Sequence, residues 1–379
     1  MGKLVVPDKL KKINKLISSK EYKEALYYIE RLLQTEPNSF FNHYLKGLVL
    51  HNMEQFEDAV EWFKLSISLK GDFDDAYNNL GVALKKLGDL EGSEVQLRAA
   101  LKVNPKNIGF YQNLGSVLIE QKKYTEAEIV LKKAISLDPK SWRVQYKIGE
   151  LYEKMDRVDD AFFKYKELIQ QKINPILGLV KSAELYKKKD DAASALKYYE
   201  KANELIGEKS PIKEHIAKSF IELNQLEKAL KILLTILPLR NYRVDLVLRT
   251  SEALQRANRI DEAIDIIKAA IKLHPNAEIL YFKMGNIFKT QNIFSSAIFY
   301  YQKAIKIKTD FYEAYSNLGN VYIDIGKYNA ATKALKKALK LNKEQNYGKF
   351  SALLNLGNTE ITIKKFKEGW EKYEYRWKV

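Results

Sequence analysis

The chain has 379 residues, with 64 Lys and Arg against 48 Asp and Glu, a formal net charge of +16, and 46% hydrophobic residues. It contains no Cys, which excludes disulfide frameworks, Cys-ligated zinc, iron–sulfur clusters and thiol nucleophiles, and its low Pro and Gly content is that of neither collagen nor a disordered chain. No apolar stretch approaches 18 residues and the N-terminus lacks a signal-peptide core, so we predict no membrane span and a cytoplasmic location.

The positive charge is carried mainly by Lys, since only ten of the 64 basic residues are Arg. Proteins that bind phosphate or base edges favour Arg, whose planar guanidinium makes bidentate contacts. We therefore expect nucleic acid to be an unlikely partner. A basic RNA-binding solenoid stays open as a second alternative, with its Arg between residues 240 and 259.

A period of 34 residues organises the chain when repeats are counted from Val6. Position 8 of the repeat is small in nine of ten repeats, and position 11 is always large and apolar. Position 20 is small throughout: Ala25, Ala59, Ser93, Ala127, Ala161, Ala195, Ala229, Ala263, Ala297 and Ala331. The pattern predicts two helices per repeat, with small residues where their backbones approach closely.

The first expected element, a helix over residues 8–18, carries several Lys and suits a polar N-terminal cap. The repeats that follow have the clearest motifs. The fourth reads Tyr111-Gln112-Asn113-Leu114-Gly115, followed by Leu118, Ala127, Leu131, Ala134 and Pro139.

These residues resemble the tetratricopeptide repeat family. The resemblance implies an all-α, right-handed superhelical solenoid of about eleven helix-turn-helix repeats. We place ten in-phase repeats within residues 1–345, starting near 6, 40, 74, 108, 142, 176, 210, 244, 278 and 312. Residues 346–379 are expected to hold a four-residue slip and an eleventh, partly divergent repeat with an aromatic C-terminal helix.

The middle repeats, residues 142–243, lack the Pro that four other repeats carry at position 32, as Pro37, Pro105, Pro139 and Pro275. Ile173, Gly207 and Asn241 stand there instead. We expect the loops between repeats to differ in this stretch, because Pro fixes the backbone and ends a helix.

In the family, the first helix of each repeat lines the concave surface, and positions 2, 5, 6, 9, 12 and 13 would face the groove. Position 6 holds Asn79, Asn113, Asn317 and Asn355, with Asn320 one turn beyond Asn317. This row resembles the asparagine ladder of the O-linked N-acetylglucosamine transferase group and implies binding of an extended peptide backbone. The alternative is that these Asn side chains only form hydrogen bonds to the end of a neighbouring helix.

Between the two Asn blocks, position 6 is basic: Lys147, Lys181, His215, Arg249 and Lys283, with Arg256 on the same face as Arg249. This run could attract acidic segments. The alternative is local pairing, because Glu150, Glu184 and Glu252 lie three residues after Lys147, Lys181 and Arg249.

The last expected element is rich in aromatic residues. Trp370, Tyr373 and Trp377 share one helix face by spacing. They either pack on the eleventh repeat or also dock a further domain. The run from Phe366 to Trp377 is similar to the segment that closes the repeats in bacterial repeat–glycosyltransferase fusions.

We find no catalytic or metal-binding constellation and expect no cofactor. The prediction is a non-catalytic solenoid that binds extended polypeptide in its groove, as the substrate-recruiting arm of a protein or glycan glycosyltransferase whose catalytic domain is outside this chain. The first alternative is a stand-alone scaffold that assembles protein complexes.

Overall fold

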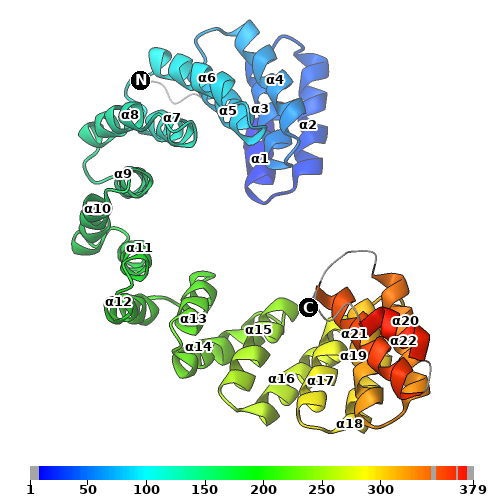
Figure 1. Ribbon diagram of the computed structural model, residues 1–379. Helices are drawn as coiled ribbons and strands as arrows, with labels where there is room; N and C mark the ends of the chain where they lie inside the picture. The colour runs from blue at the N-terminus through cyan, green and yellow to red at the C-terminus, as the bar shows by residue number, and fades with distance from the viewer. Residues whose placement is uncertain (1–7, 343–346, 364–365, 374–379) are drawn as a thin grey trace. The chain divides into compact units, whose positions relative to one another are not determined.

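The computed structural model describes residues 8–342, 347–363 and 366–373, and these residues form 22 α-helices and no strand. Helices that follow one another pack together over residues 8–188 and again over residues 212–373, as the expected all-α solenoid of helix pairs requires, so this prediction of fold class is confirmed (Figure 1). Contacts divide the chain into two compact units, here called the N-terminal unit (residues 1–204) and the C-terminal unit (residues 205–379).

In the N-terminal unit, helices alternate between the first and the second helix of a pair. The first helices are α1 (Asp8–Ser18), α3 (Phe40–Asn52), α5 (Asp74–Lys86), α7 (Ile108–Glu120), α9 (Trp142–Lys154) and α11 (Pro175–Lys188). The second helices are α2 (Tyr22–Thr35), α4 (Phe56–Leu69), α6 (Leu90–Val103), α8 (Tyr124–Leu137), α10 (Val158–Gln170) and α12 (Ala192–Leu205), which reaches the boundary between the units.

The C-terminal unit follows the same alternation. Its first helices are α13 (Ile212–Glu222), α15 (Val244–Arg256), α17 (Glu278–Thr290), α19 (Tyr312–Asp324) and α21 (Tyr347–Thr362). Its second helices are α14 (Leu226–Leu239), α16 (Ile260–Leu273), α18 (Phe294–Ile307), α20 (Tyr328–Leu341) and α22 (Phe366–Tyr373). No helix among the described residues is long and apolar enough to cross a bilayer.

Small residues hold each helix pair together at close range. All ten residues at position 20 have 0% exposure. At position 8, a Cβ added to Gly115 would lie 2.6 Å from Cδ2 of Leu131, and one added to Gly149 would lie 2.4 Å from Cε1 of Tyr165. A larger side chain at these glycines would therefore push the two helices apart.

The turn within each pair contains a left-handed residue at the same position of the ten in-phase repeats. Position 15 has a positive φ in all ten: Lys20, Glu54, Gly88, Lys122, Asp156, Asp190, Asn224, Asn258, Asn292 and Gly326. A left-handed residue just after a helix lets the next amide groups bond back to its last carbonyls, as Lys123 N–H does to Leu118 O at 2.8 Å. Eight of these residues are not Gly, so the helix pairs hold them in a conformation that L-residues disfavour.

Two of the loops between the middle repeats contain left-handed residues at or beside position 32. Lys172, Asn241 and Tyr242 have positive φ, and they lie at the two boundaries that carry Ile173 and Asn241 at position 32. The backbone without Pro is free to adopt these values, because the pyrrolidine ring holds φ near −65°.

The last helix pair contains a buried ion cluster. The Glu360 side chain is only 1% exposed and contacts Lys336 of α20 at 3.1 Å and Lys372 of α22 at 2.7 Å. Burial opposes its ionisation, but the hydrogen bonds from Lys372 and Lys336 outweigh burial and hold the pKa of Glu360 below its ordinary value. Beside this cluster the backbones of α21 and α22 meet at Gly357 and Gly369.

Candidate functional site

Two hollows adjoin each other on the first helices of the N-terminal unit. One, of about 320 Å³, lies between α5 and α7, and the other, of about 440 Å³, between α7, α9 and α11. Both are lined by Ser116 and Glu120 of α7, so they form one surface, here called the first-helix trough. The other side chains that line it are Val82, Lys85, Lys86, Leu97, Asn113, Val117, Ile119, Lys147, Glu150, Glu153, Lys154 and Lys181.

Most of these residues stand at positions 6, 9, 12 and 13 of their repeats. Asn113, Lys147 and Lys181 are the position-6 residues of three successive repeats, and each lines the trough. A helix turn brings residues three and four apart onto one face, which explains why one residue per turn of each first helix reaches the same surface.

Three of the five lysines that line the trough are paired with carboxylates. Lys147 contacts Glu150 at 2.7 Å within its own helix, and Lys85 reaches across to Glu120 of the next first helix at 2.6 Å. Lys181 contacts Glu184 at 2.8 Å. Burial alone would lower the pKa of Lys181, but this carboxylate raises it above its ordinary value. The trough is therefore a surface of mixed charge rather than a positive field.

The asparagines of position 6 link neighbouring repeats. In each case the side-chain amide donates to a residue of the preceding first helix, so part of its hydrogen-bonding capacity is used inside the fold. The bonds run from Asn79 to Tyr44 Oη (2.9 Å), Asn113 to Asn78 Oδ1 (2.8 Å), Asn317 to Asn286 Oδ1 (2.8 Å) and Asn355 to Asn320 Oδ1 (2.8 Å).

In the C-terminal unit, the basic position-6 residues lie on three successive first helices. His215 is exposed on α13, and Arg249 is half-buried on α15. Lys283 of α17 contacts Glu252 at 2.7 Å, so the carboxylate that the sequence pairs with Arg249 bonds to the next repeat instead. Arg256 donates to Asn224 Oδ1 at 3.3 Å.

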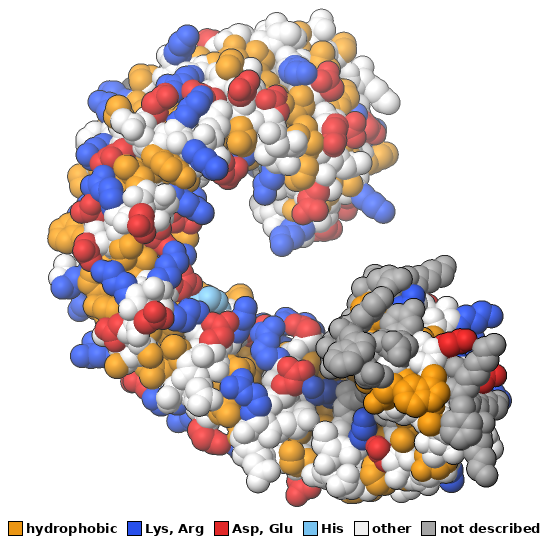
Figure 2. Space-filling view, in the orientation of Figure 1, with side chains coloured by type: hydrophobic (Ala, Val, Ile, Leu, Met, Phe, Trp, Pro, Cys, Tyr) orange, Lys and Arg blue, Asp and Glu red, His pale blue; other side chains and the backbone are white. Residues whose placement is uncertain are grey.

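Arginines near these residues are also matched with acids. Arg243 contacts Glu214 at 2.8 Å and Asp245 at 2.6 Å, and Arg259 contacts Glu262 at 2.7 Å. On the face that Figure 2 shows, acidic and basic side chains are interspersed along both units. Arg240 also contacts Glu214, at 3.3 Å, so three of the five arginines between residues 240 and 259 form ion pairs.

The aromatic C-terminal helix exposes one large ring. Trp370 of α22 is 52% exposed and meets Tyr373 edge to face, with 5.4 Å between ring centroids. Trp377, the third residue of the predicted face, lies outside the described residues.

Comparison with protein families matches several repeat models. A model described as the N-terminal TPR repeats region of Psidin matches residues 8–140. Models described as tetratricopeptide repeat match residues 143–171, 178–208, 279–311 and 312–345.

Two curated relatives each match 94 residues of the chain. A TPR repeat-containing protein of Methanocaldococcus jannaschii is 33% identical over 24% of this chain and 16% of its own length. The Protein STIP1 homolog of Dictyostelium discoideum is 31% identical over 25% of this chain and 17% of its own length. Each match thus spans about one sixth of the relative's own length.

Similar solved structures include the type IV pilus biogenesis factor PilW, with 19% identity and a TM-score of 0.49 over 54% of this chain and 94% of that one. Yeast Tom70 covers 97% of this chain and 90% of its own, with 14% identity and a TM-score of 0.40.

Proposed function

Because the chain is built of tetratricopeptide repeats, a fold typical of protein–protein interaction scaffolds, we propose that its first-helix trough binds an extended polypeptide. The observation that carries the proposal is the sharing of Ser116 and Glu120 by two adjoining hollows, which makes a continuous surface across successive repeats. The proposed role is recruitment of a protein partner without catalysis by this chain.

The spacing of the repeats suits an extended chain. Helix α7 contacts both α5 and α9, and packed helices lie about 8–10 Å apart. An extended peptide advances about 3.3 Å per residue, so one repeat corresponds to about three peptide residues. A peptide lying across the trough would therefore meet equivalent positions at a regular interval.

The chemistry of the trough suits a peptide backbone. Along it stand an amide (Asn113), a hydroxyl (Ser116), carboxylates (Glu120, Glu150) and ammonium groups (Lys147), which together offer donors and acceptors. Peptide N–H and C=O groups need both kinds of partner when they leave water. Because the charges are mixed, the trough would select weakly for the charge of the peptide's side chains.

A substitution at the shared residue tests this proposal. Ser116→Phe places a ring where the two hollows meet and leaves the charge unchanged. The matched control is Ser136→Phe, on the exposed side of α8. The probe is the tightest 12-residue sequence selected from a displayed random peptide library on the wild-type protein.

Affinity of that peptide should fall at least tenfold in Ser116→Phe and stay within twofold in Ser136→Phe, as measured by calorimetry. Selection of no peptide, or equal binding by wild type and Ser116→Phe, would rule out the trough as the binding surface.

A second candidate function, recruitment of substrates for a glycosyltransferase, is favoured by the exposed ring of Trp370, which a neighbouring domain would cover. Reading the coding sequence past codon 379 tests it. A sugar-transfer domain in frame supports the transferase arm, and a stop codon supports the stand-alone scaffold.

A further inference from the structure

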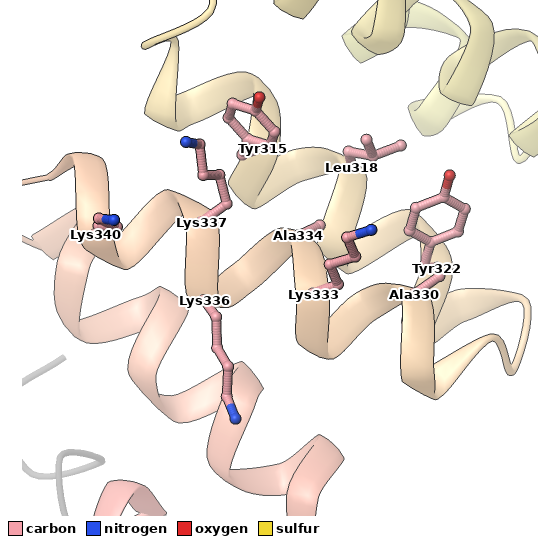
Figure 3. Close-up of a pocket in the computed structure, with 9 residues that line it drawn as sticks. All are labelled: Tyr315, Leu318, Tyr322, Ala330, Lys333, Ala334, Lys336, Lys337 and Lys340. Atoms are coloured by element: carbon pink, nitrogen blue, oxygen red, sulfur yellow. The ribbon is translucent and has the colours of Figure 1, made fainter.

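A third hollow lies in the C-terminal unit, between the two helices of one repeat. It has a volume of about 610 Å³, within the ~300–1,000 Å³ range of ligand pockets, and opens between α19 and α20 (Figure 3). Its lining consists of Tyr315, Leu318, Tyr322, Ala330, Lys333, Ala334, Lys336, Lys337 and Lys340. None of these residues belongs to the positions that line the first-helix trough.

The hollow has a cause in the sequence. Position 23 of the repeat holds a larger side chain in the other nine repeats: Tyr28, Trp62, Gln96, Val130, Lys164, Tyr198, Ile232, Ile266 and Tyr300. In the preceding repeat, the Tyr300 ring stacks on Phe288 with 5.4 Å between centroids and an interplanar angle of 9°. Ala334 occupies this position in the repeat of the hollow, so Tyr322, the counterpart of Phe288, has no ring stacked from α20.

The rim of the hollow is cationic. Helix α20 contains no Asp or Glu, and within the described part of the chain Lys333, Lys337 and Lys340 have no acidic partner. Figure 3 shows Lys333 and Lys337 extending toward α19, whereas Lys336 points away, toward Glu360, its partner at 3.1 Å. Apolar walls below unpaired ammonium groups therefore distinguish this site from the paired lysines of the trough.

We propose that this hollow anchors an aromatic side chain of an acidic peptide segment, with the carboxylates of the segment on Lys333, Lys337 and Lys340. The ring would take the place that Tyr300 fills in the preceding repeat, between an apolar floor and Tyr322. Carboxylates on either side of the ring would meet the ammonium groups of the rim.

Single-stranded RNA also combines rings with negative charge, but it fits this site less well. A base carries polar groups around its edge that need hydrogen-bond partners. Leu318, Ala330 and Ala334 offer none from their side chains, and the lining contains no Arg. An aromatic hydrocarbon side chain has no such requirement.

The inference is independent of the first-helix trough, because the two sites share no residue and lie in different units. The test uses the full chain and a fluorescein-labelled peptide of nine residues, with one Phe between four Glu on each side. Binding is followed by fluorescence anisotropy, beside the same peptide with Phe replaced by Ala and an oligouridylate of nine nucleotides.

Two sets of variants separate the ring from the charge. Ala334→Tyr fills the hollow with the side chain of the preceding repeat and leaves the charge unchanged. Lys337→Gln with Lys340→Gln removes two rim charges, and its matched control is Lys303→Gln with Lys306→Gln, at the same positions of α18.

We expect Ala334→Tyr to weaken the peptide at least tenfold while the helical content is kept. The Lys337/Lys340 variant should lose about fivefold or more, and the Lys303/Lys306 control less than twofold. Replacing the Phe of the peptide by Ala should also cost at least tenfold.

Three results would overturn the proposal: no binding of the Phe peptide to the wild type, equal binding to Ala334→Tyr, or tighter binding of the oligouridylate than of the peptide. A variant Ala334→Leu, with a smaller side chain that any helix tolerates, repeats the filling test if Ala334→Tyr does not fold. It too should weaken the peptide.

Discussion

The first-helix trough and the α19–α20 hollow use the same residue type, Lys, in opposite ways. In the trough, Lys147 and Lys181 each contact a glutamate three residues later, at 2.7 and 2.8 Å. At the hollow, Lys333 and Lys337 stand above an apolar floor with no acid on their helix. A net charge of +16 is therefore a poor guide to binding, because what a partner meets depends on how the cations are paired locally.

The comparison is sharpest within α20, where Lys336 is paired with buried Glu360 and Lys333 is unpaired. Glu360→Ala leaves two ammonium groups without their carboxylate beside the last helix pair. We expect it to destabilise α21 and α22 by about 1–2 kcal/mol, because the two ammonium groups left behind are 54% and 23% exposed and can turn to water. Hydrogen exchange of the amides in α21 measures this loss of stability. The control is Lys333→Ala, whose stability should lie within about 0.5 kcal/mol of wild type.

Acid should weaken the same helix pair. The pKa of Glu360 is lowered in the folded protein, so its contribution to stability is complete above the ordinary value of 4.5 and is lost as the pH falls through the lower, folded value. Exchange protection of α21 should thus drop below about pH 4.5 in wild type. In Glu360→Gln the drop assigned to this carboxylate should be absent, and an unchanged profile would contradict its role.

Turns at position 15 allow the two units to be compared at one backbone geometry. Gly326 in the C-terminal unit and Lys122 in the N-terminal unit have φ of +72° and +62°. Lys122→Gly should stabilise its repeat by about 1 kcal/mol, and Gly326→Ala should destabilise its own by about 1 kcal/mol. Urea unfolding followed by circular dichroism tests both, and equal stability of Lys122→Gly and wild type would show that the turn is not strained.

A smaller effect is expected in the trough itself. Asn113→Ala removes the bond to Asn78 Oδ1 and should cost about 0.5–1.5 kcal/mol, since both partners are half-buried amides. The peptide affinity of Asn113→Ala therefore has to be compared with that of wild type at an equal fraction of folded protein. Ser116→Phe is the matching variant, because it leaves the Asn113–Asn78 bond in place.

The fold could be predicted because its cause recurs in the sequence. Gly149 and Ala161 are small because the two helices of their repeat approach each other closely. Small residues recur at position 20 in all ten repeats and at position 8 in nine of them. The positive φ of position 15 cannot be predicted from the sequence, because only Gly88 and Gly326 are glycines there and the packed helices impose the other turns.

The sites were harder to predict, because they depend on contacts between residues about one repeat apart. The sequence pairs Arg249 with Glu252 inside one helix, whereas Glu252 contacts Lys283, 31 residues later. The hollow could have been found from Ala334, which stands where other repeats have a larger residue. The sequence does not show that its unpaired lysines border a pocket, because the other wall of the hollow is formed by α19.

The most direct test of two separate binding surfaces is one binding experiment on three proteins: wild type, Ser116→Phe and Ala334→Tyr. Each is titrated with the peptide selected on the trough and with the acidic Phe peptide. We predict that Ser116→Phe weakens only the first peptide and Ala334→Tyr only the second, each at least tenfold. If one substitution weakens both peptides equally, or neither substitution has an effect, the account of two surfaces is contradicted.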